Sequence, residues 1–358
     1  MATYRNPDFL RLPARLAALF AGAAQDSFFV LPAWFDLMAR YGVAANTAIR
    51  VVSDERPGSA AALVLTETRD EGGRRLKSLA NAYSVEHGIV HSPGSYLDGG
   101  LAAILDEIVD ETPPWDGLVL CELDPRDRAY QAAVTALRGH GFLVECVFDS
   151  GTWFEDTRGM RFADYLAARP SALRHTWQRK RRQAAANGRI ATRHFRDTLG
   201  IEAAIADYQA IYARSWKPSE AYPQFIPALI RLAAEMGALR LGLMTLDGLP
   251  VAAQFWIVWR GRAVIYKLAH DQRFDAFSPG TLLTMELFER VLDEDRPAEI
   301  NFGRGDDPYK KLWLPRRRER WGIRAANPRT LRGLKFGLRR EAAKLYHRWR
   351  GEALAPTG

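Results

Sequence analysis

The chain has 358 residues, 47% of them hydrophobic, and carries 50 Lys and Arg against 42 Asp and Glu for a net charge of +8. This length exceeds the usual single core, so we expect two domains, and the hydrophobic share excludes a largely disordered protein. The positive charge favours anionic partners such as phosphates, acidic glycans, RNA or anionic lipid, but it does not choose among them.

The cysteine content and the apolar runs bear on where the protein works. Cys121 and Cys146 both lie in apolar runs, which predicts buried free thiols rather than a disulfide and fits a reducing compartment. Residues 1–13 have no apolar core of a secretion signal, and no apolar run approaches the roughly 20 residues needed to span a bilayer. We therefore expect a cytoplasmic protein, with peripheral attachment to the inner face of the membrane as an alternative.

The first half of the chain alternates helical and strand patterns. Apolar periodicity and the turn residues between the segments predict two helices, three strands, a helix, a strand, a helix and a strand. These elements are expected over 11–23, 31–42, 48–55, 61–70, 74–81, 96–111, 115–124, 127–141 and 142–156.

The second half has a similar order of elements. A helix with an Arg-Pro break at Pro170 is followed by a strand, two helices, three strands, a helix, a strand, a short helical or loop segment, a strand and a long helix. A crossover helix between the third and fourth main strands implies a mixed sheet with helices on both faces, so we expect an α/β fold. We place domains at 1–158 and 159–328, followed by a basic amphipathic helix and tail at 329–358.

The stretch 241–313 is the one on which the functional argument depends. Asp247-Gly248 predicts a tight turn between two strands, and a third strand ends near Asp271. Ser278-Pro279-Gly280 leads directly into a helix, whose free backbone N–H groups at Gly280, Thr281 and Leu282 favour an anion.

Short motifs across the second half occur in an order and spacing that resemble those of a known family. They are Phe162, Tyr165, Arg169-Pro170-Ser171, Arg179-Lys180, Ser215-Trp216, Leu246-Asp247-Gly248, Ala252-Ala253-Gln254, Tyr266-Lys267, Ser278-Pro279-Gly280, Phe302-Gly303 and Tyr309-Lys310. With the order of elements, they resemble the GNAT acyltransferase superfamily, its FemAB-like tandem members, and more specifically the cellulose-biosynthesis acetyltransferases of the CelD/BcsL type.

The resemblance implies an acyl-CoA N-acyltransferase fold, with tandem GNAT-like domains of which the first is degenerate. It also implies transfer of an acyl group, usually from acyl-CoA, to an amine or hydroxyl. The donor phosphates are then expected at Ser278, Gly280, Thr281 and Leu282. Many GNAT members have a glycine-richer loop at this place, whereas this chain has one glycine there, and FemAB-like enzymes take aminoacyl-tRNA instead.

The resemblance and the strand ends also suggest catalytic residues. We expect His270 to act as a base, Asp271 or Asp306 to orient it, and Tyr309 to protonate the leaving thiolate. Substrate contacts are expected from four polar side chains near the same strands, namely Gln254, Lys267, Arg304 and Lys310. Loop capping, helix capping and core packing are the competing structural interpretations of these residues.

Other chemistry finds little support in the sequence. His87 and His91 would need a helix to act as paired metal ligands, and Gly88 argues against one, so we expect no metal. No Walker loop and no Gly-x-Ser-x-Gly elbow is present.

The terminal helix combines an apolar stripe with many basic residues. Leu331, Leu334, Leu338, Leu345 and Trp349 recur at helical spacing. We expect this stripe to pack on the second domain with the charges in solvent. The alternative is that the helix lies on anionic lipid or holds an acidic polymer.

The sequence thus predicts a GNAT-family acyltransferase that moves an acyl, most simply acetyl, group from acyl-CoA to a sugar, a polysaccharide precursor or a lipid. The class expected is transfer of groups other than aminoacyl groups. Two alternatives remain. One is an aminoacyl-tRNA-dependent transferase, with tRNA as a partner. The other is a non-catalytic basic module that binds RNA or anionic glycan.

Overall fold

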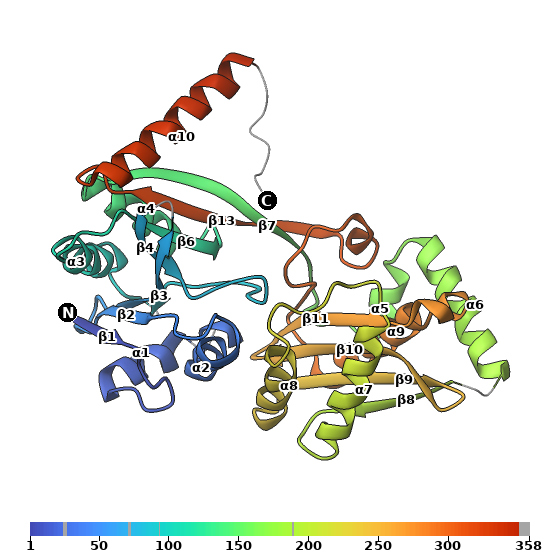
Figure 1. The fold of residues 1–358 in the computed structure, drawn as a ribbon. Helices are drawn as coiled ribbons and strands as arrows, with labels where there is room; N and C mark the ends of the chain where they lie inside the picture. The colour runs from blue at the N-terminus through green and yellow to red at the C-terminus, as the bar shows by residue number, and fades with distance from the viewer. Residues whose placement is uncertain (24–26, 71–72, 93, 188–189, 351–358) are drawn as a thin grey trace. The chain divides into compact units, whose positions relative to one another are not determined.

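The chain folds into two compact units that are built from separate stretches of sequence. The computed structural model describes residues 1–23, 27–70, 73–92, 94–187 and 190–350 (Figure 1). Unit 1 contains Met1–Gly151 together with the residues from Glu319 onward, and unit 2 contains Thr152–Arg318. Two strands, β7 (Leu143–Asp156) and β13 (Arg316–Ala326), have residues in both units. Residues 319–328, which we expected in the second domain, are thus grouped with the first half of the chain.

Unit 1 is a mixed sheet with helices on it. The antiparallel strands are β1 (Ala2–Arg5), β2 (Ile49–Asp54), β3 (Ala61–Asp70) and β4 (Gly73–Ser78), and β6 (Gly117–Leu123) then pairs with β4 in parallel. The short β5 (Val90–His91) pairs with β3. The helices are α1 (Ala14–Ala23), α2 (Pro32–Tyr41), α3 (Leu97–Val109), α4 (Arg128–Gly139) and α10 (Leu331–Arg350).

Unit 2 is built around a second mixed sheet. In spatial order the strands are the end of β7, β12 (Glu299–Asn301), β11 (Arg262–His270), β10 (Leu249–Trp259), β9 (Leu239–Leu246) and β8 (Ile190–Phe195). Only the β11–β12 pairing within this set is parallel. The helices are α5 (Phe162–Ala167), α6 (Ser171–Asn187), α7 (Ile201–Ala213), α8 (Phe225–Glu235) and α9 (Pro279–Arg290).

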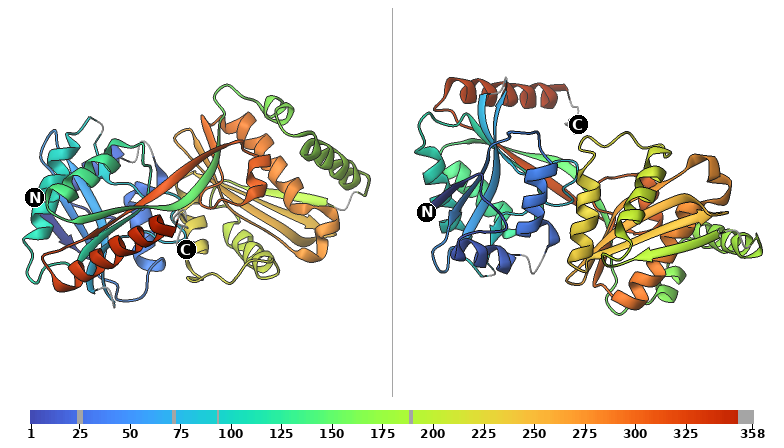
Figure 2. Two further views of the ribbon diagram at one scale, coloured as in Figure 1. Left: turned by 90° about the horizontal axis from the view of Figure 1, so that it is seen from above. Right: turned by 60° about the horizontal axis from the view of Figure 1, so that its bottom comes forward.

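Helices cover both faces of the sheet in unit 2. Successive residues of a strand point to opposite faces, so two neighbouring residues of β10 contact two different helices. Phe255 of β10 packs edge-on against Tyr208 of α7, with ring centroids 5.8 Å apart. The next residue, Trp256, packs edge-on against Phe288 of α9 at 4.9 Å. Figure 2 shows α7 (yellow-green) and α9 (orange) on opposite sides of the strands. The expected α/β class, with a mixed sheet between helices, is confirmed.

Two tight turns connect strands β9 to β11, and the first is the one that Asp247-Gly248 predicts. Asp247 and Gly248 both have positive φ, 51° and 79°, in the two-residue turn between β9 and β10. Arg260 and Gly261 do the same between β10 and β11, at 45° and 77°. The strands β1 and β5 are elements that the sequence pattern did not predict, because both are too short to carry a periodic signal.

The terminal helix α10 packs differently from our expectation. Its Gly333 and Gly337 lie against unit 1, where an added Cβ would meet the Asn327 carbonyl oxygen at 2.1 Å and Leu143 Cδ1 at 2.4 Å. Glycine at these two positions brings the helix backbone close to the sheet. The leucine stripe therefore does not pack on the second domain: Leu331 is 88% exposed and Leu338 is 58% exposed. The side chains of Leu345 and Trp349 lie outside those described.

Two further expectations concern the thiols and the membrane. Cys121 and Cys146 are free, as expected, but both are half-buried rather than buried. Among the described residues, no helix combines the length and the apolar character needed to cross a bilayer.

Candidate active site

The sheet of unit 2 opens between β11 and β12. The two strands pair at only three positions, the last being Val264 with Asn301, although β11 continues to His270. The Asn301 side chain accepts a hydrogen bond from the Gly303 N–H at 3.0 Å, and Gly303 has a φ of 60°. This local turn directs the chain away from β11, so β11 beyond Val264 has no β12 partner.

The helix α9 begins beside this opening. Ser278 is left-handed, with φ 52° and ψ 49°, and Pro279 occupies the first helical position, where it needs no hydrogen-bond donor. The Leu282 N–H donates to the Ser278 carbonyl at 3.1 Å, which is the first bond of the helix. This corrects our expectation for Leu282: its N–H is used within the helix. Gly280 and Thr281 precede that bond and are the donors that remain at the helix terminus.

A lysine lies beside the segment that leads into α9. Lys180 of α6 donates from Nζ to the backbone carbonyl of Ala276, two residues before Ser278. In the sequence, Lys180 is part of the Arg179-Lys180 motif, to which we assigned no role in the site. In the structure this cation and the amino end of α9, whose backbone dipoles also favour negative charge, act on the same side of the opening.

His270, the last residue of β11, is held on three sides. Its Nε2 lies 2.8 Å from Asp275 Oδ1, and its ring contacts that of Trp216 with centroids 4.7 Å apart. The other nitrogen, Nδ1, is buried without a hydrogen-bond partner and lies 3.0 Å from the position that a Cβ on Gly280 would take. The carboxylate on Nε2 favours the proton there, which leaves the Nδ1 lone pair facing the start of α9.

The residue that orients His270 differs from our expectation. Asp271 is almost fully buried and pairs with Arg273, at 2.7 Å, and with Arg214, at 3.0 Å. The hydrogen bond from Arg273 is the main cause that lowers the pKa of Asp271. With both oxygens occupied by guanidinium groups, Asp271 is not available to the imidazole, and Asp275 takes that position.

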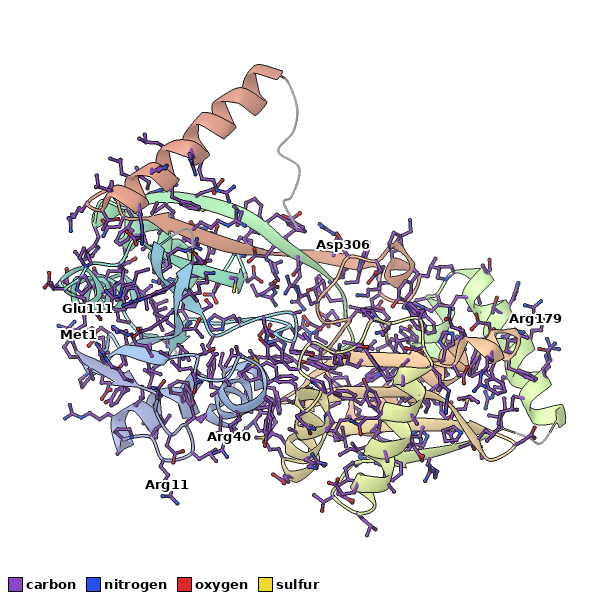
Figure 3. The ribbon with its side chains drawn as sticks, viewed as in Figure 1. Met1, Arg11, Arg40, Glu111, Arg179 and Asp306 are labelled. Atoms are coloured by element: carbon purple, nitrogen blue, oxygen red, sulfur yellow. The ribbon has the colours of Figure 1, made fainter. Side chains whose placement is uncertain are left out.

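The segment after β12 is fixed by two ion pairs. Asp306, which is labelled in Figure 3, binds Arg317 through both of its oxygens, at 3.0 Å and 2.6 Å. This contact lowers the pKa of Asp306. Asp306 therefore does not orient His270 either. The buried Lys310 Nζ lies 2.9 Å from Asp307 Oδ2 and donates to the carbonyls of Arg304 and Gly305 at 3.2 Å and 3.1 Å.

Tyr309 and Arg304 lie on the outside of the same segment. Tyr309 is 46% exposed, and desolvation raises its pKa to about 12, with Asp307 as the second cause. The phenol keeps its proton at neutral pH, and the raised pKa makes it a weaker acid than a free tyrosine. The Arg304 side chain is exposed, and its backbone carbonyl supports Lys310.

Gln254 is placed inside the domain rather than at its surface. Its side chain is 1% exposed, and Oε1 accepts a hydrogen bond from Thr284 Oγ1 of α9 at 3.0 Å. Its Nε2 is buried without a partner. Thr284 Oγ1 also lies 2.7 Å from the Gly280 carbonyl, so Gln254 connects β10 to the first turn of α9.

Three residues of the loop after α7 lie near the site, and only Trp216 among them drew attention in the sequence. Lys267 of β11 pairs with Glu220 of this loop at 2.8 Å. Between Trp216 and Glu220 lies Lys217, whose pKa is lowered to about 8 by burial and then by the charge of Lys267. The sequence offered no signal for Lys217 or Glu220, because a charged residue in a loop is usually solvated.

A cavity of about 500 Å³ opens on the other side of α9 from the residues above. Its apolar part includes Trp177, Ile190 and Leu282, and its charged part includes Glu286 and Arg290. Leu282 is thus part of this wall and of the core rather than of the anion-binding end of α9. In the described part of the chain no group of three His, Cys, Asp or Glu residues is arranged to hold a metal ion.

One protein family matches the part of the chain that contains this site. Residues 171–311 match the family described as Acetyltransferase (GNAT) domain, a range that covers α6 to η4 (Pro308–Leu312). A search of curated proteins with the sequence found no match. Neither comparison identifies the CelD/BcsL family that the sequence resembles.

Solved structures resemble the whole chain at low identity. FemX is 10% identical, with a TM-score of 0.62 over 90% of this chain and 97% of that one. L-PGS from Bacillus licheniformis is 10% identical, with a TM-score of 0.52 over 93% and 97%. The C-terminal domain of a protein assigned as lysylphosphatidylglycerol synthetase from Agrobacterium fabrum is 11% identical, with a TM-score of 0.51 over 84% and 90%. At these identities the likeness establishes a shared fold and nothing finer, and the match to an acetyltransferase (GNAT) domain is confined to residues 171–311.

Proposed function

We propose that this protein transfers an acyl group, with acetyl the simplest case, from acyl-CoA to an amine or hydroxyl of a sugar, polysaccharide precursor or lipid. The observation that carries the proposal is the opening between β11 and β12 beside the amino end of α9. Backbone N–H groups at Gly280 and Thr281, with Lys180 beside them, provide a place for the donor phosphates. The match to an acetyltransferase domain over 171–311 supports the same assignment.

The reaction needs three things from the protein. The acceptor nitrogen or oxygen forms a bond to the acyl carbon as the carbon–sulfur bond breaks, so the acceptor loses a proton and the thiolate gains one. We assign proton uptake to His270 Nδ1, with Asp275 on its other nitrogen, and proton donation to Tyr309. Asp271 and Asp306, each paired with arginine, hold the chain directly after His270 and shortly before Tyr309.

Calorimetric titration of the full-length protein with acetyl-CoA tests the donor site. We expect saturable binding in the natural protein and a loss of roughly tenfold or more in Gly280→Glu, because a carboxylate at the amino end of α9 repels phosphate. Gly139→Glu in α4 is the matched control, since nothing lies within 4 Å of a Cβ there. Equal affinities of the two variants, or no binding by the natural protein, would overturn the assignment.

Aminoacyl-tRNA is the second candidate donor. The likeness to FemX and to a protein assigned as lysylphosphatidylglycerol synthetase supports it, and the exclusion of aminoacyl groups that we expected from the sequence has no support in these neighbours. The net charge of +8 also suits a nucleic-acid donor. Transfer of a labelled amino acid from charged tRNA, without any heat of acetyl-CoA binding, would favour this donor.

A non-catalytic basic module for RNA or anionic glycan is the remaining alternative. The single glycine at the start of α9, where many GNAT members have a richer loop, is the feature that favours it. Such a protein would bind the polymer with a steep dependence on salt and would show no dependence on Gly280.

We further propose that α10 contacts an anionic membrane surface. Leu331, Leu334 and Leu338 are exposed on it, and Arg332, Lys335 and Arg339 are exposed around them. Apolar side chains among cations fit the surface of a bilayer that contains anionic lipid. Co-sedimentation of the full chain with vesicles of equal phosphatidylglycerol and phosphatidylcholine tests this. We expect binding that Leu334→Ser with Leu338→Ser weakens, and no binding to phosphatidylcholine alone.

A further inference from the structure

Lys217 has an unusual position for a loop lysine. It lies in the connection between α7 and α8, where its backbone N–H donates to Ser215 Oγ at 3.3 Å. Its side chain is half-buried, and its Nζ lies 5.7 Å from the centre of the Trp216 ring. In the part of the chain that the structure describes, no carboxylate forms an ion pair with Lys217.

The charges around Lys217 are already matched to one another. Glu220 pairs with Lys267 at 2.8 Å, and Asp307 pairs with Lys310 at 2.9 Å. Burial is the largest cause that lowers the pKa of Lys217 to about 8; the charges of Lys267 and Lys310 add to it, and those of Glu220 and Asp307 act in the opposite direction. Three ammonium groups thus share two carboxylates, which leaves one positive charge in excess. A partly buried group of charges with an excess cation is costly, and an anionic ligand would offset that cost.

Lys217 lies close to the opening between β11 and β12. Lys267 belongs to β11 beyond Val264, the last residue paired with β12. Lys310 belongs to the segment that follows β12 after it has turned away. The Lys217 Nζ lies 5.7 Å from the centre of the Trp216 ring, and that ring lies 4.7 Å from the ring of His270 at the end of β11, so the ammonium group lies near the opening. Lys180 and the amino end of α9, which we assigned to the donor phosphates, are separate from these three lysines in sequence and in their contacts.

We propose that Lys217, with Lys267 beside it, holds an anionic group of the acceptor, a carboxylate or a phosphate. This inference rests on the proposed transferase function, because it places the acceptor at the opening of the sheet. An ammonium group forms charge-assisted hydrogen bonds with either anion, and partial burial strengthens them. The acceptor class is thereby narrowed to molecules that carry a negative charge near the amine or hydroxyl to be acylated.

Titration of the full-length protein with inorganic phosphate and with acetate, at constant ionic strength, tests the site. We expect saturable binding of at least one anion, weakened about tenfold in Lys217→Gln. Lys217→Arg keeps the charge and should retain binding within about threefold. The matched control is Lys311→Gln, which removes the same charge from an exposed lysine of the neighbouring segment and should bind as the natural protein does. The relative affinities for phosphate and acetate distinguish the two anions, and equal binding by both glutamine variants would overturn the proposal.

Acetyl-CoA binding separates this inference from the proposed function. We expect Lys217→Gln to bind acetyl-CoA as tightly as the natural protein. A matching loss of acetyl-CoA affinity would show that Lys217 serves the donor, which overturns the acceptor assignment. If the natural protein ignores acetyl-CoA while phosphate still binds through Lys217, the transferase proposal fails and the anion site stands.

The pKa of the Lys217 amine gives a second measurement. Phosphate would leave this pKa unchanged if Lys217 had only a structural role. After reductive methylation with labelled formaldehyde, its signal can be assigned by its loss in Lys217→Gln and titrated by NMR. We expect its pKa to rise when phosphate is added, because a bound anion stabilises the charged form. An unchanged pKa at saturating phosphate would count against the site.

Discussion

The two units contain the same local arrangement, and only one of them leaves it open. In unit 1 a crossover helix, α3, joins the parallel strands β4 and β6, and in unit 2 α9 joins β11 and β12. Each parallel pair has three registered positions. Beyond them, however, the Ser78 hydroxyl accepts a hydrogen bond from Cys121 N–H, and His87 N–H donates to the Glu122 carbonyl, so the chain itself fills the gap in unit 1. In unit 2 the Asn301 turn leads the chain away instead.

The amino ends of the two crossover helices differ in the same way. An added Cβ on Gly100, in the first turn of α3, would lie 2.1 Å from the Ser59 carbonyl oxygen, so backbone is packed directly against that end. On Gly280, in the first turn of α9, the three nearest atoms would all belong to the His270 ring, the first of them at 3.0 Å. A helix amino end blocked by backbone cannot take a ligand, whereas one faced by a side chain can. The comparison therefore suggests that unit 1 supports the fold and unit 2 carries the chemistry.

We expect the largest effect from a substitution at the amino end of α3 in unit 1, where backbone packs against the helix. Gly100→Val forces a side chain into the Ser59 backbone, so we expect a loss of about 3 kcal/mol in the free energy of unfolding. Urea unfolding of the full chain measures it. Gly139→Val, which adds a side chain to open space in α4, is the control and should stay within about 1 kcal/mol. A mild Gly100→Val variant would show that the end of α3 is not packed as described.

The next prediction uses the buried imidazole that helps to fill unit 1. Burial lowers the pKa of His87 to about 4, so the folded protein keeps it neutral while the unfolded chain protonates it near 6.5. The unfolded state then binds more protons, and stability falls as the pH drops from about 6.5 toward 4. Between pH 7 and 4.5 we expect the natural protein to lose about 2 kcal/mol more than His87→Phe. Parallel stability curves for the two proteins would contradict the buried neutral state.

At the amino end of α9, a small substitution should change the stability of the protein little but should weaken acetyl-CoA binding. Gly280→Ala adds a methyl group against the His270 ring, which can move, so we expect a cost below about 1 kcal/mol in unfolding. The shifted ring should weaken acetyl-CoA binding several-fold. Thermal unfolding and calorimetry on the same sample measure the two effects. A large loss of stability with unchanged binding would reverse the proposed contrast between the helices.

The smallest effect is expected at Gln254. Leucine in its place removes the hydrogen bond from Thr284 but also removes a buried amide nitrogen that has no partner, so stability should change by less than about 1 kcal/mol. Thr284 keeps its bond to the Gly280 carbonyl, and acetyl-CoA affinity should change less than in Gly280→Ala. Chemical unfolding with the Thr284→Val variant as a comparison checks this. A loss above 2 kcal/mol would mean that the Nε2 group has a structural partner.

Most of the elements were predictable because their signals are local. The turns at Asp247-Gly248 and Arg260-Gly261, the helix after Pro279 and the break at Pro170 all depend on residues within a few positions. The site was less predictable, because its contacts join distant segments. Asp275 rather than Asp271 meets His270, since two arginines, one of them 57 positions earlier in the chain, occupy Asp271. No spacing rule contains that information.

The sequence by itself determined the order of strands and helices and the place where a helix amino end follows a strand. Apolar periodicity, glycine and proline affect only one or two turns of the chain, so the elements that they favour can be predicted without knowing the fold. Only the tertiary structure decided which of the two parallel strand pairs stays open, which carboxylates are neutralised by arginine, and that Lys217, Lys267 and Lys310 share two carboxylates. Those outcomes depend on burial and on charges brought together from remote segments, and both exist only once the chain has packed.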